Sequence, residues 1–478
     1  MRTSKIALSL ACIGMLVSCG GGGGGGTPTP TAGTGGGGNT ADCSIGGRLT
    51  FTESVFNEWY LFPNLLDTSL NRNSFNNVQD YIDALVAPAR AQNRDRFFSF
   101  VTSIAEETAF ANSGSTAGFG IRLTYDTVNR RVFVIESYDR SPAVNANIER
   151  GTEIVGVGTT SGNIQSTDSL LASGGPQAFI DALGPSNPGV TRVLDIIDSN
   201  GTRRQVSVTK ADYDLDPVPR YGAQIINDGG KQVGYIRLTN FINPAIADLQ
   251  AAFADFRAAG VTEVVIDLRY NGGGRINVLE EFADLLGRGN EGNVFETIAF
   301  RASKSENNST YRFQTDNRAI APTRIAFITT GGSASASEAL INGMVPYLGT
   351  NMAMVGTNTF GKPVGQSAFD LAACDDRLRV VTLQLENADG NGAYFNGLAD
   401  TVPVTCRASD DIFNNFGDPN ETMLAQALDF LDGQSCTAIA DSGPGPRTNA
   451  IEAPQEPPEL LTPERPRTFI EYEMPGLY

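Results

Sequence analysis

The sequence has 478 residues, of which 41% are apolar, and its formal net charge is -18 with no histidine. This length allows two or three domains with sizeable cores, and the acidic balance disfavours nucleic acid and anionic lipid headgroups as partners. The lack of histidine excludes a Ser-His-Asp triad and any histidine-ligated metal site.

The first residues have the pattern of an export signal. Basic residues precede a short apolar run over residues 6–17, which is too short to span a bilayer as a mature helix. The run ends in Leu-Val-Ser-Cys, which resembles a bacterial lipobox. This pattern predicts a lipoprotein signal peptide over residues 1–18 and an acylated Cys19. The alternative is a plain secretory signal with an incidental cysteine.

The next segment, residues 19–42, consists mostly of glycine, threonine and proline and predicts a flexible tether. Gly20 follows the lipobox cysteine, and by the bacterial sorting rule a residue other than aspartate favours the outer membrane. We therefore expect a protein of the bacterial cell envelope that is lipid-anchored in the outer membrane and faces the periplasm.

Four further cysteines lie beyond the tether. An even number in an exported protein predicts two disulfides. Of the three pairings, we expect Cys374 with Cys406, which would clip one hairpin region, and Cys43 with Cys436, which would join the two ends of the folded body. Metal binding is the alternative, but the spacings contain no C-x-x-C pair, so we expect no metal.

The following two segments differ in periodicity. Residues 43–103 place apolar side chains at helical spacing and predict a small N-terminal helical domain, with Trp59 in its core. From 104 to 215 the pattern changes to short strands. A helix is expected over residues 177–183.

The strand-rich segment contains two motifs of a known module. Gly118-Phe119-Gly120-Ile121 looks like the carboxylate-binding loop of a PDZ domain, and residues 141–154 resemble the helix and turn of that domain. Asn147 and Thr152 depart from the usual glycine and aspartate. We expect a PDZ-like β domain that binds peptide by strand addition, although a β-turn with no ligand would explain the loop alone.

Residues 216–436 alternate strands and helices, whereas residues 437–478 are rich in proline and glutamate and predict a disordered tail. Within the alternating region, a strand over 261–268 and a strand over 324–328 both end in glycines before a helix. A serine on the second turn, Ser335, would lie beside unpaired helix-start amides, as a nucleophile does. The alternative is an ordinary N-capping serine.

The motifs together resemble those of the C-terminal processing peptidases, also called tail-specific proteases. Ser-Ala-Ser-Ala-Ser-Glu at 333–338 is followed by Phe-Gly-Lys and by Gln366, and Asp-Leu-Arg-x-Asn-x-Gly-Gly precedes them at 267–274. The resemblance implies that Ser335 is the nucleophile, that Lys362 is the general base and that Gln366 orients the lysine. Pro363 replaces a common glycine, which a lysine in a strand or loop tolerates.

The same resemblance implies the rest of the expected mechanism. The oxyanion amides would come from Gly273 and Ala336, while Asp267 and Arg269 are expected to be structural ties. The expected fold is multidomain α+β, with a helical domain, a PDZ-like β domain and an α/β peptidase domain of the ClpP/crotonase-like type.

The sequence therefore predicts a serine endopeptidase that needs no cofactor and acts on protein or peptide substrates. An adaptor protein would be a further partner, of unknown identity. A catalytically silent PDZ scaffold of the same fold is the main alternative, and a small-molecule hydrolase is a third.

Overall fold

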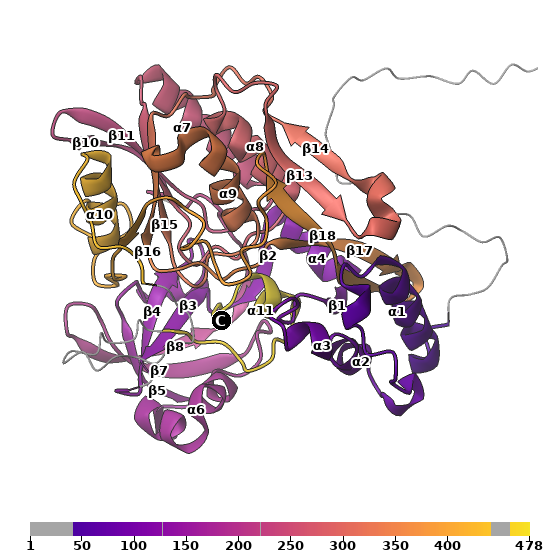
Figure 1. Cartoon of the computed structure of the whole chain (residues 1–478). Coiled ribbons are helices and arrows are strands. Elements are labelled where there is room, and N and C mark those ends of the chain that lie inside the picture. Colours follow the sequence, from indigo (N-terminus) through magenta and orange to yellow (C-terminus); the bar gives the residue numbers. More distant parts are fainter. Residues whose placement is uncertain (1–41, 127, 220, 441–458) are drawn as a thin grey trace, which may run out of the picture.

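The computed structural model describes residues 42–126, 128–219, 221–440 and 459–478. The expected signal peptide, the acylated Cys19 and nearly all of the tether lie outside these residues. In Figure 1 the N-terminal helices, a β domain and a larger α/β domain occupy three regions, and α11 lies where the three meet. Among the described residues, none of the helices combines the length and apolarity needed to cross a bilayer.

The α/β domain is built on a six-stranded sheet in the order β10-β11-β12-β15-β16-β19. Every neighbouring pair from β11 to β19 is parallel, and β10 is antiparallel to β11. The strands are β10 (Ala223–Asp228), β11 (Lys231–Arg237), β12 (Glu263–Asp267), β15 (Arg324–Thr329), β16 (Met352–Gly356) and β19 (Thr405–Arg407). Parallel strands are buried on both faces, which explains their continuous apolar sequences.

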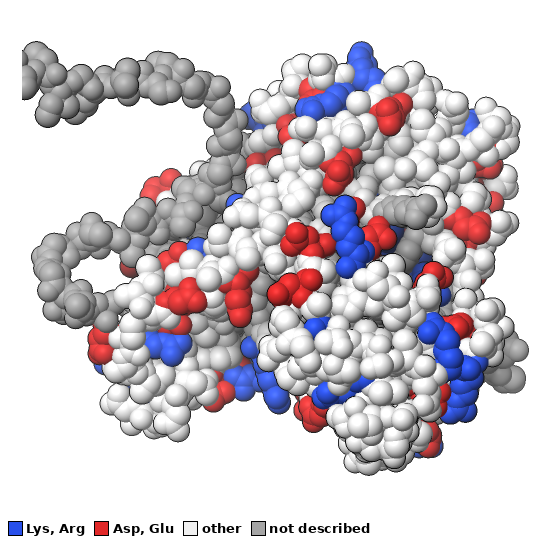
Figure 2. Space-filling view, turned by 180° about the vertical axis from the view of Figure 1, so that it is seen from behind, with Lys and Arg blue, Asp and Glu red and all other residues white. Residues whose placement is uncertain are grey.

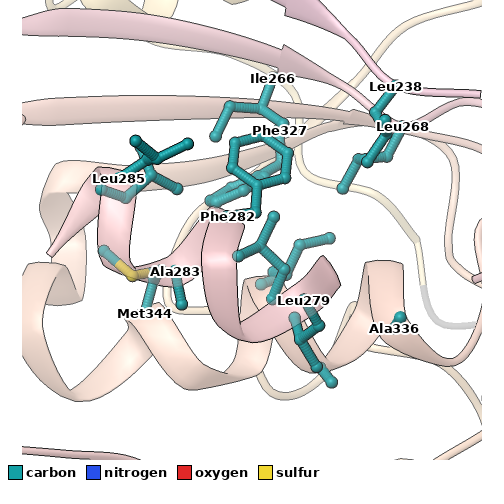
Figure 3. Close-up of a cluster of buried hydrophobic side chains, with 14 of the residues drawn as sticks. Leu238, Ile266, Leu268, Leu279, Phe282, Ala283, Leu285, Phe327, Ala336 and Met344 are labelled. Carbon is teal, nitrogen blue, oxygen red and sulfur yellow. The ribbon is translucent and has the colours of Figure 1, made fainter. Parts of the chain in front are cut away.

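Helices cover both faces of this sheet. They are α7 (Ala245–Ala258), α8 (Ile276–Leu286) and α9 (Ala336–Leu348) on one face, and α10 (Thr422–Leu431) on the other. In β12, Val264 and Ile266 face the first three helices, while Val265 faces α10. Figure 3 shows Ile266 and Phe327 from the strands packed on Phe282 of α8. The sheet therefore holds the ends of β12 and β15 firmly, and both lead into the glycine turns.

A second, five-stranded sheet joins the N-terminal segment to the α/β domain. Its strands are β1 (Phe100–Ser103), β13 (Val294–Phe300), β14 (Ser309–Arg312), β17 (Val364–Leu371) and β18 (Asp376–Asn387). The helices α1 (Ile45–Trp59), α2 (Val78–Leu85) and α3 (Ala87–Arg90) share one core with β17 and β18. Because Phe100 pairs with Arg379 of β18, the expected helical segment ends as a strand of this sheet.

Residues 115–214, called the β domain here, follow helix α4 (Ile104–Ser113). That helix starts where short strands were expected. The β domain contains β2 (Ser115–Gly118), β3 (Ile121–Asp126), β4 (Arg131–Ser137), α5 (Pro142–Asn145), β5 (Glu153–Gly158), β6 (Gln165–Ser166), α6 (Thr167–Leu183), β7 (Thr191–Ile197), β8 (Arg203–Thr209) and β9 (Ala211–Asp214). The helix expected over 177–183 is the second half of α6.

The last described segment folds, contrary to the expected disordered tail over 437–478. Residues 459–478 contain β20 (Glu459–Leu460) and α11 (Phe469–Glu473). Phe469 packs edge-on against Phe110, and the ring of Tyr472 stacks on Phe100 with centroids 4.0 Å apart. The prediction relied on proline and glutamate content, whereas these few aromatic side chains find apolar partners far away in the sequence.

The disulfide pairing also differs from the expected one. The bonds are Cys43–Cys374 and Cys406–Cys436. Cys406 lies on β19 of the parallel sheet, beside the segment that follows α10, so Cys436 is its near neighbour. Cys374 lies between β17 and β18, on which α1 packs, and is therefore close to Cys43.

Charged side chains are spread over the surface. On the face shown in Figure 2, acidic and basic residues are interspersed among uncharged ones. The net negative charge is therefore distributed over this face and is accompanied by many basic residues.

Candidate active site

The backbone turns sharply between β15 and α9, and Ser335 lies at the turn. Its φ of 56° and ψ of -115° are unusual for a residue with a side chain. Ser333 and Ser337 are buried, and their hydroxyls donate to the carbonyls of Leu268 and Asn271 at 2.8 and 3.0 Å. Ser335 is only half-buried and lines a cleft, so it is the serine of this motif that a substrate can reach.

The glycine turn after β12 lies directly against Ser335. A Cβ at Gly273 would be 2.7 Å from the Ser335 Cβ and 2.9 Å from the Ala336 nitrogen, so this close approach requires glycine. The structure thus brings the two expected oxyanion residues, Gly273 and Ala336, to the serine. The N–H of Gly273 donates to Asn271 Oδ1 at 2.9 Å and would have to leave this bond to bind an oxyanion.

Lys362 lies on the loop between β16 and β17 and is half-buried. Its Nζ is 5.2 Å from the centroid of the Phe98 ring. Burial lowers the pKa of Lys362, while the charges of Glu473 and Asp95 oppose this shift. A lowered pKa favours the neutral amine that a general base requires.

Ser335 and Lys362 are not joined by a hydrogen bond in the described part of the chain. The side-chain amide of Gln366 donates to the carbonyl of Phe98, and the described residues show no bond from it to Lys362. The two cavities at the site reflect this separation. Ser335 lines a cleft of about 1310 Å³ and Lys362 lines a cavity of about 660 Å³, whereas Gln366 borders both.

A carboxylate that sequence reasoning missed connects the serine turn to the lysine loop. Glu338 is fully buried and accepts hydrogen bonds from the backbone N–H groups of Ser335, Gly361 and Lys362 at 3.0, 2.6 and 2.7 Å. Burial raises the pKa of Glu338, and these hydrogen bonds together with one from Thr359 oppose that rise. The available signal was the Ser-x-x-Glu spacing of residues 335–338, which is typical of a capping box.

Asp267 and Arg269, expected to be structural ties, belong to a buried ion network. The guanidinium of Arg269 contacts Asp267 and Asp410 at 3.0 Å each and Glu421 at 2.8 Å. Arg269 is 1% exposed and Asp267 is fully buried. The network joins the end of β12 to the start of α10. None of its residues lines the cleft of Ser335, whereas Asp410 lines the cavity of Lys362.

The loop of Gly118, Phe119, Gly120 and Ile121 contacts the end of the sequence. The N–H groups of Gly120 and Ile121 donate to the carbonyl oxygen of Tyr478 at 2.9 and 3.2 Å. Tyr478 N–H donates to the Ile121 oxygen at 2.9 Å, and Leu123 N–H donates to the Gly476 oxygen at 2.9 Å. This is the hydrogen-bond pattern of an added antiparallel strand.

These features define a class of protein in which a strained serine at a strand-to-helix turn lies near a half-buried lysine in a mixed α/β, multidomain fold. Residues 232–404 match peptidase family S41. Residues 232–404 therefore form a peptidase family S41 domain, which confirms the resemblance found in the sequence. Carboxyl-terminal processing proteases are its relatives in sequence.

Two relatives illustrate the similarity. The chloroplastic C-terminal processing peptidase of Tetradesmus obliquus is 27% identical over 269 residues, which cover 54% of this chain and 54% of that protein. The carboxyl-terminal-processing protease of a Picosynechococcus species is 29% identical over 266 residues, which cover 55% of this chain and 58% of the other. The chain thus spans about half the length of the relatives it matches.

A solved structure is similar in fold. A protein of Bacteroides fragilis assigned to the S41 proteases superimposes with a TM-score of 0.62 and 23% identity, covering 80% of this chain and 97% of that chain. At this identity the similarity concerns the fold, and the chemistry of the site must be argued from its own residues.

Proposed function

We propose that the protein is a serine endopeptidase in which Ser335 is the nucleophile and Lys362 is the general base. The observation that carries this proposal is the connection through Glu338, which binds the backbone of both residues and so fixes the serine turn relative to the lysine loop. The strained backbone of Ser335 is a second support, because nucleophilic serines commonly occupy such turns.

The mechanism follows from the groups present. A neutral Lys362 amine takes the proton of the Ser335 hydroxyl while the oxygen attacks a peptide carbonyl. The Ala336 amide, joined by that of Gly273 once it leaves Asn271, stabilises the resulting oxyanion. Lys362 then donates the proton to the leaving amine, and water hydrolyses the acyl-enzyme by the reverse sequence. A free lysine has a pKa near 10.4, so only about one in 2,500 would be neutral at pH 7. Burial is therefore essential to the base.

We further propose that the β domain is a PDZ-like module that captures protein substrates by their C-terminal or unfolded segments. The support is that residues 476–478 already lie along β3 as an added strand, with the Tyr478 carbonyl at the amides of Gly120 and Ile121. Peptide recognition by strand addition uses the same main-chain bonds.

An envelope location with a lipid anchor at Cys19 remains part of the proposal. The two disulfides support an oxidising compartment, since such bonds persist mainly in exported proteins. Mass spectrometry of the protein purified from membranes would test it, and an unmodified cysteine in a freely secreted product would contradict it.

The experiment that tests the peptidase is labelling with a fluorophosphonate probe together with cleavage of an unfolded protein. Ser335→Ala and Lys362→Ala should abolish both signals, whereas Ser333→Ala should keep labelling, because its hydroxyl is bonded to Leu268. Ser305→Ala, at an exposed position, is the matched control. Folded protein that neither labels nor cleaves, and still binds peptide, would favour a silent binding protein instead.

A further inference from the structure

Residues 459–478, called the C-terminal segment here, connect the three regions of the molecule. In Figure 1 α11 and the end of the chain lie between the β domain, the N-terminal helices and the α/β domain. Arg465 contacts Asp80 and Asp83 of the N-terminal helices at 2.8 and 2.5 Å. The segment is thus tied to the N-terminal helices by ion pairs.

Its last residues fill the peptide groove of the β domain. Tyr478 is 5% exposed and belongs to the same apolar cluster as Phe119, Ile121, Phe179 and Leu183, so its side chain is part of the core of the β domain. A Cβ at Gly118 would be 2.8 Å from the Tyr478 carbonyl carbon, which shows how closely the loop surrounds it. A peptide that binds β3 at this position must first displace residues 476–478.

The other half of the edge of β3 is also covered by this segment. Glu459 and Leu460 pair with Tyr125 and Thr124, and the Leu461 N–H donates to the Leu123 oxygen at 2.9 Å. The Tyr478 hydroxyl donates to the Leu461 carbonyl at 2.9 Å, which connects the two parts. The edge of β3 is therefore paired with the C-terminal segment from Ile121 to Tyr125.

The same segment reaches the catalytic residues. A Cβ at Gly272 would lie 2.9 Å from the Glu473 carbonyl oxygen, so the end of α11 lies on the glycine turn that faces Ser335. Glu473 lines the cleft together with Ser335, while Tyr472 and Pro475 line the cavity together with Lys362. The segment thus narrows the space that a substrate backbone would need.

The charge of Glu473 acts on the base as well. Of the charges that oppose the lowering of the Lys362 pKa, that of Glu473 acts most strongly. Burial raises the pKa of Glu473 itself, and Lys362 and Arg379 oppose this. Removal of this carboxylate would make the neutral amine easier to form, so the segment disfavours the reactive protonation state in addition to occupying space.

We propose that the C-terminal segment is an intramolecular ligand of the β-domain groove that holds the peptidase closed, and that the activating ligand is an apolar peptide that presents a bulky aromatic side chain at the position of Tyr478. Such a peptide would replace Tyr478 in its pocket and release α11 from the site. The activity part of this inference rests on the proposed peptidase function, whereas the binding part does not.

The binding part is tested on the full chain with a synthetic peptide of residues 469–478 that carries a free carboxylate. Hydrogen exchange is measured for residues 121–125 and for α11. The peptide should increase exchange in the chain's own α11, while β3 stays protected by the incoming strand. An amidated peptide and one with alanine in place of the last tyrosine should need about tenfold higher concentrations. Unchanged exchange at saturating free-carboxylate peptide would overturn the proposal.

The activity part uses Tyr478→Asp, which places a charge in the apolar pocket. Cleavage of an unfolded protein should rise about tenfold, and added peptide should raise the parent enzyme towards the same rate. Arg467→Ala, an exposed position of the same segment, is the control and should leave the rate unchanged. Glu473→Gln should raise the rate at neutral pH and shift its pH profile to lower pH, an effect that loss of packing alone would not produce.

These readouts separate the two proposals. If peptide displaces α11 but no variant cleaves or labels, the ligand assignment holds and the peptidase assignment fails. If the parent cleaves and neither Tyr478→Asp nor peptide changes the cleavage rate, the C-terminal segment stabilises the fold without inhibiting the peptidase, and the proposal that it holds the peptidase closed fails. If Tyr478→Asp lowers the melting temperature, its cleavage rate is not interpretable, and the change in the parent's rate with added peptide decides whether the segment holds the peptidase closed.

Discussion

Glu338 binds the backbone of Lys362 directly: its carboxylate oxygen accepts the lysine N–H at 2.7 Å, although the two residues belong to different elements. The same carboxylate accepts the N–H of Ser335 at 3.0 Å. The distance between nucleophile and base therefore depends on a group that contacts neither reacting atom. We regard Glu338 as a positioning residue.

The first prediction concerns this residue. Glu338→Gln replaces one acceptor oxygen by an NH₂ group that faces N–H donors, so we expect the stability to fall by about 2–3 kcal/mol and fluorophosphonate labelling to slow strongly. Glu338→Asp should retain part of the labelling rate because it keeps the charge. Glu306→Gln, on an exposed side chain, is the control. Labelling of folded Glu338→Gln at the parent rate would contradict the positioning role.

The second prediction concerns Lys362. Burial lowers the pKa of Lys362 in the folded state below the 10.5 of the unfolded chain. At pH values between the two pKa values the unfolded chain binds more protons than the folded protein, so the contribution of Lys362 to stability rises with pH. Lys362→Met should therefore raise the melting temperature at neutral pH, and the gain should shrink towards pH 10.5.

The acylation rate of the parent should increase with pH along one ascending limb, and Lys362→Arg should be inactive because guanidinium stays charged.

Lys231→Met provides a control of opposite sign for the stability measurement. Burial lowers the pKa of Lys231, but Asp432 and Glu263 outweigh this effect and raise it above 10.5. The stabilisation by the Lys231 charge is therefore present at neutral pH and is lost as the pH rises through the raised pKa. Its removal should lower the melting temperature slightly. Equal pH profiles for the two variants would refute the account of Lys362.

The third prediction concerns the buried ion network. Arg269→Met leaves the carboxylates of Asp267 and Glu421 without their partner, so we expect a loss of about 3–5 kcal/mol in denaturant unfolding. Arg203 pairs with Asp195 through a side chain that is 63% exposed, so Arg203→Met should cost far less stability than Arg269→Met. Comparable losses for the two variants would show that burial does not determine the effect.

The network should also respond to acid. Although burial opposes the shift, Arg150 and Arg269 lower the pKa of Asp410 below 3.8. The stabilisation by the Asp410 charge is therefore fully present above about pH 3.8, and it is lost as the pH falls through the lower pKa that Asp410 has in the folded protein. We expect the difference in melting temperature between Asp410→Asn and the parent to narrow in that acidic window.

The fourth prediction concerns the disulfides. Cys43–Cys374 closes 331 residues and Cys406–Cys436 closes 30, so loop-closure entropy assigns the larger stabilisation to the first bond. The double Cys43→Ser, Cys374→Ser variant should lose up to about 5 kcal/mol and show faster hydrogen exchange in α1. The matching pair at 406 and 436 should lose less, and its exchange should increase near α10. A reversed order of losses would contradict the entropic argument.

The sequence alone determined the local features of the site. Apolar β-branched residues end at glycines before a helix in both turns, and this pattern depends only on neighbours along the chain. The motifs at 267–274, 333–338 and 360–362 indicated the peptidase family whose model matches residues 232–404. The lack of histidine excluded a triad without any knowledge of the fold.

The tertiary structure decided the relationships between distant segments. Cysteine pairing depends on which segments lie side by side. Cys406 is on β19 of the six-stranded sheet, whereas Cys374 is in the connection between β17 and β18 of the five-stranded sheet, and sequence spacing does not show this separation. Glu338 acts on Lys362 because the loop after β16 folds back onto the start of α9. The segment around Tyr472 folds because its few aromatic side chains meet Phe100 and Phe110, and a composition rich in proline and glutamate gives no sign of partners some 370 residues away.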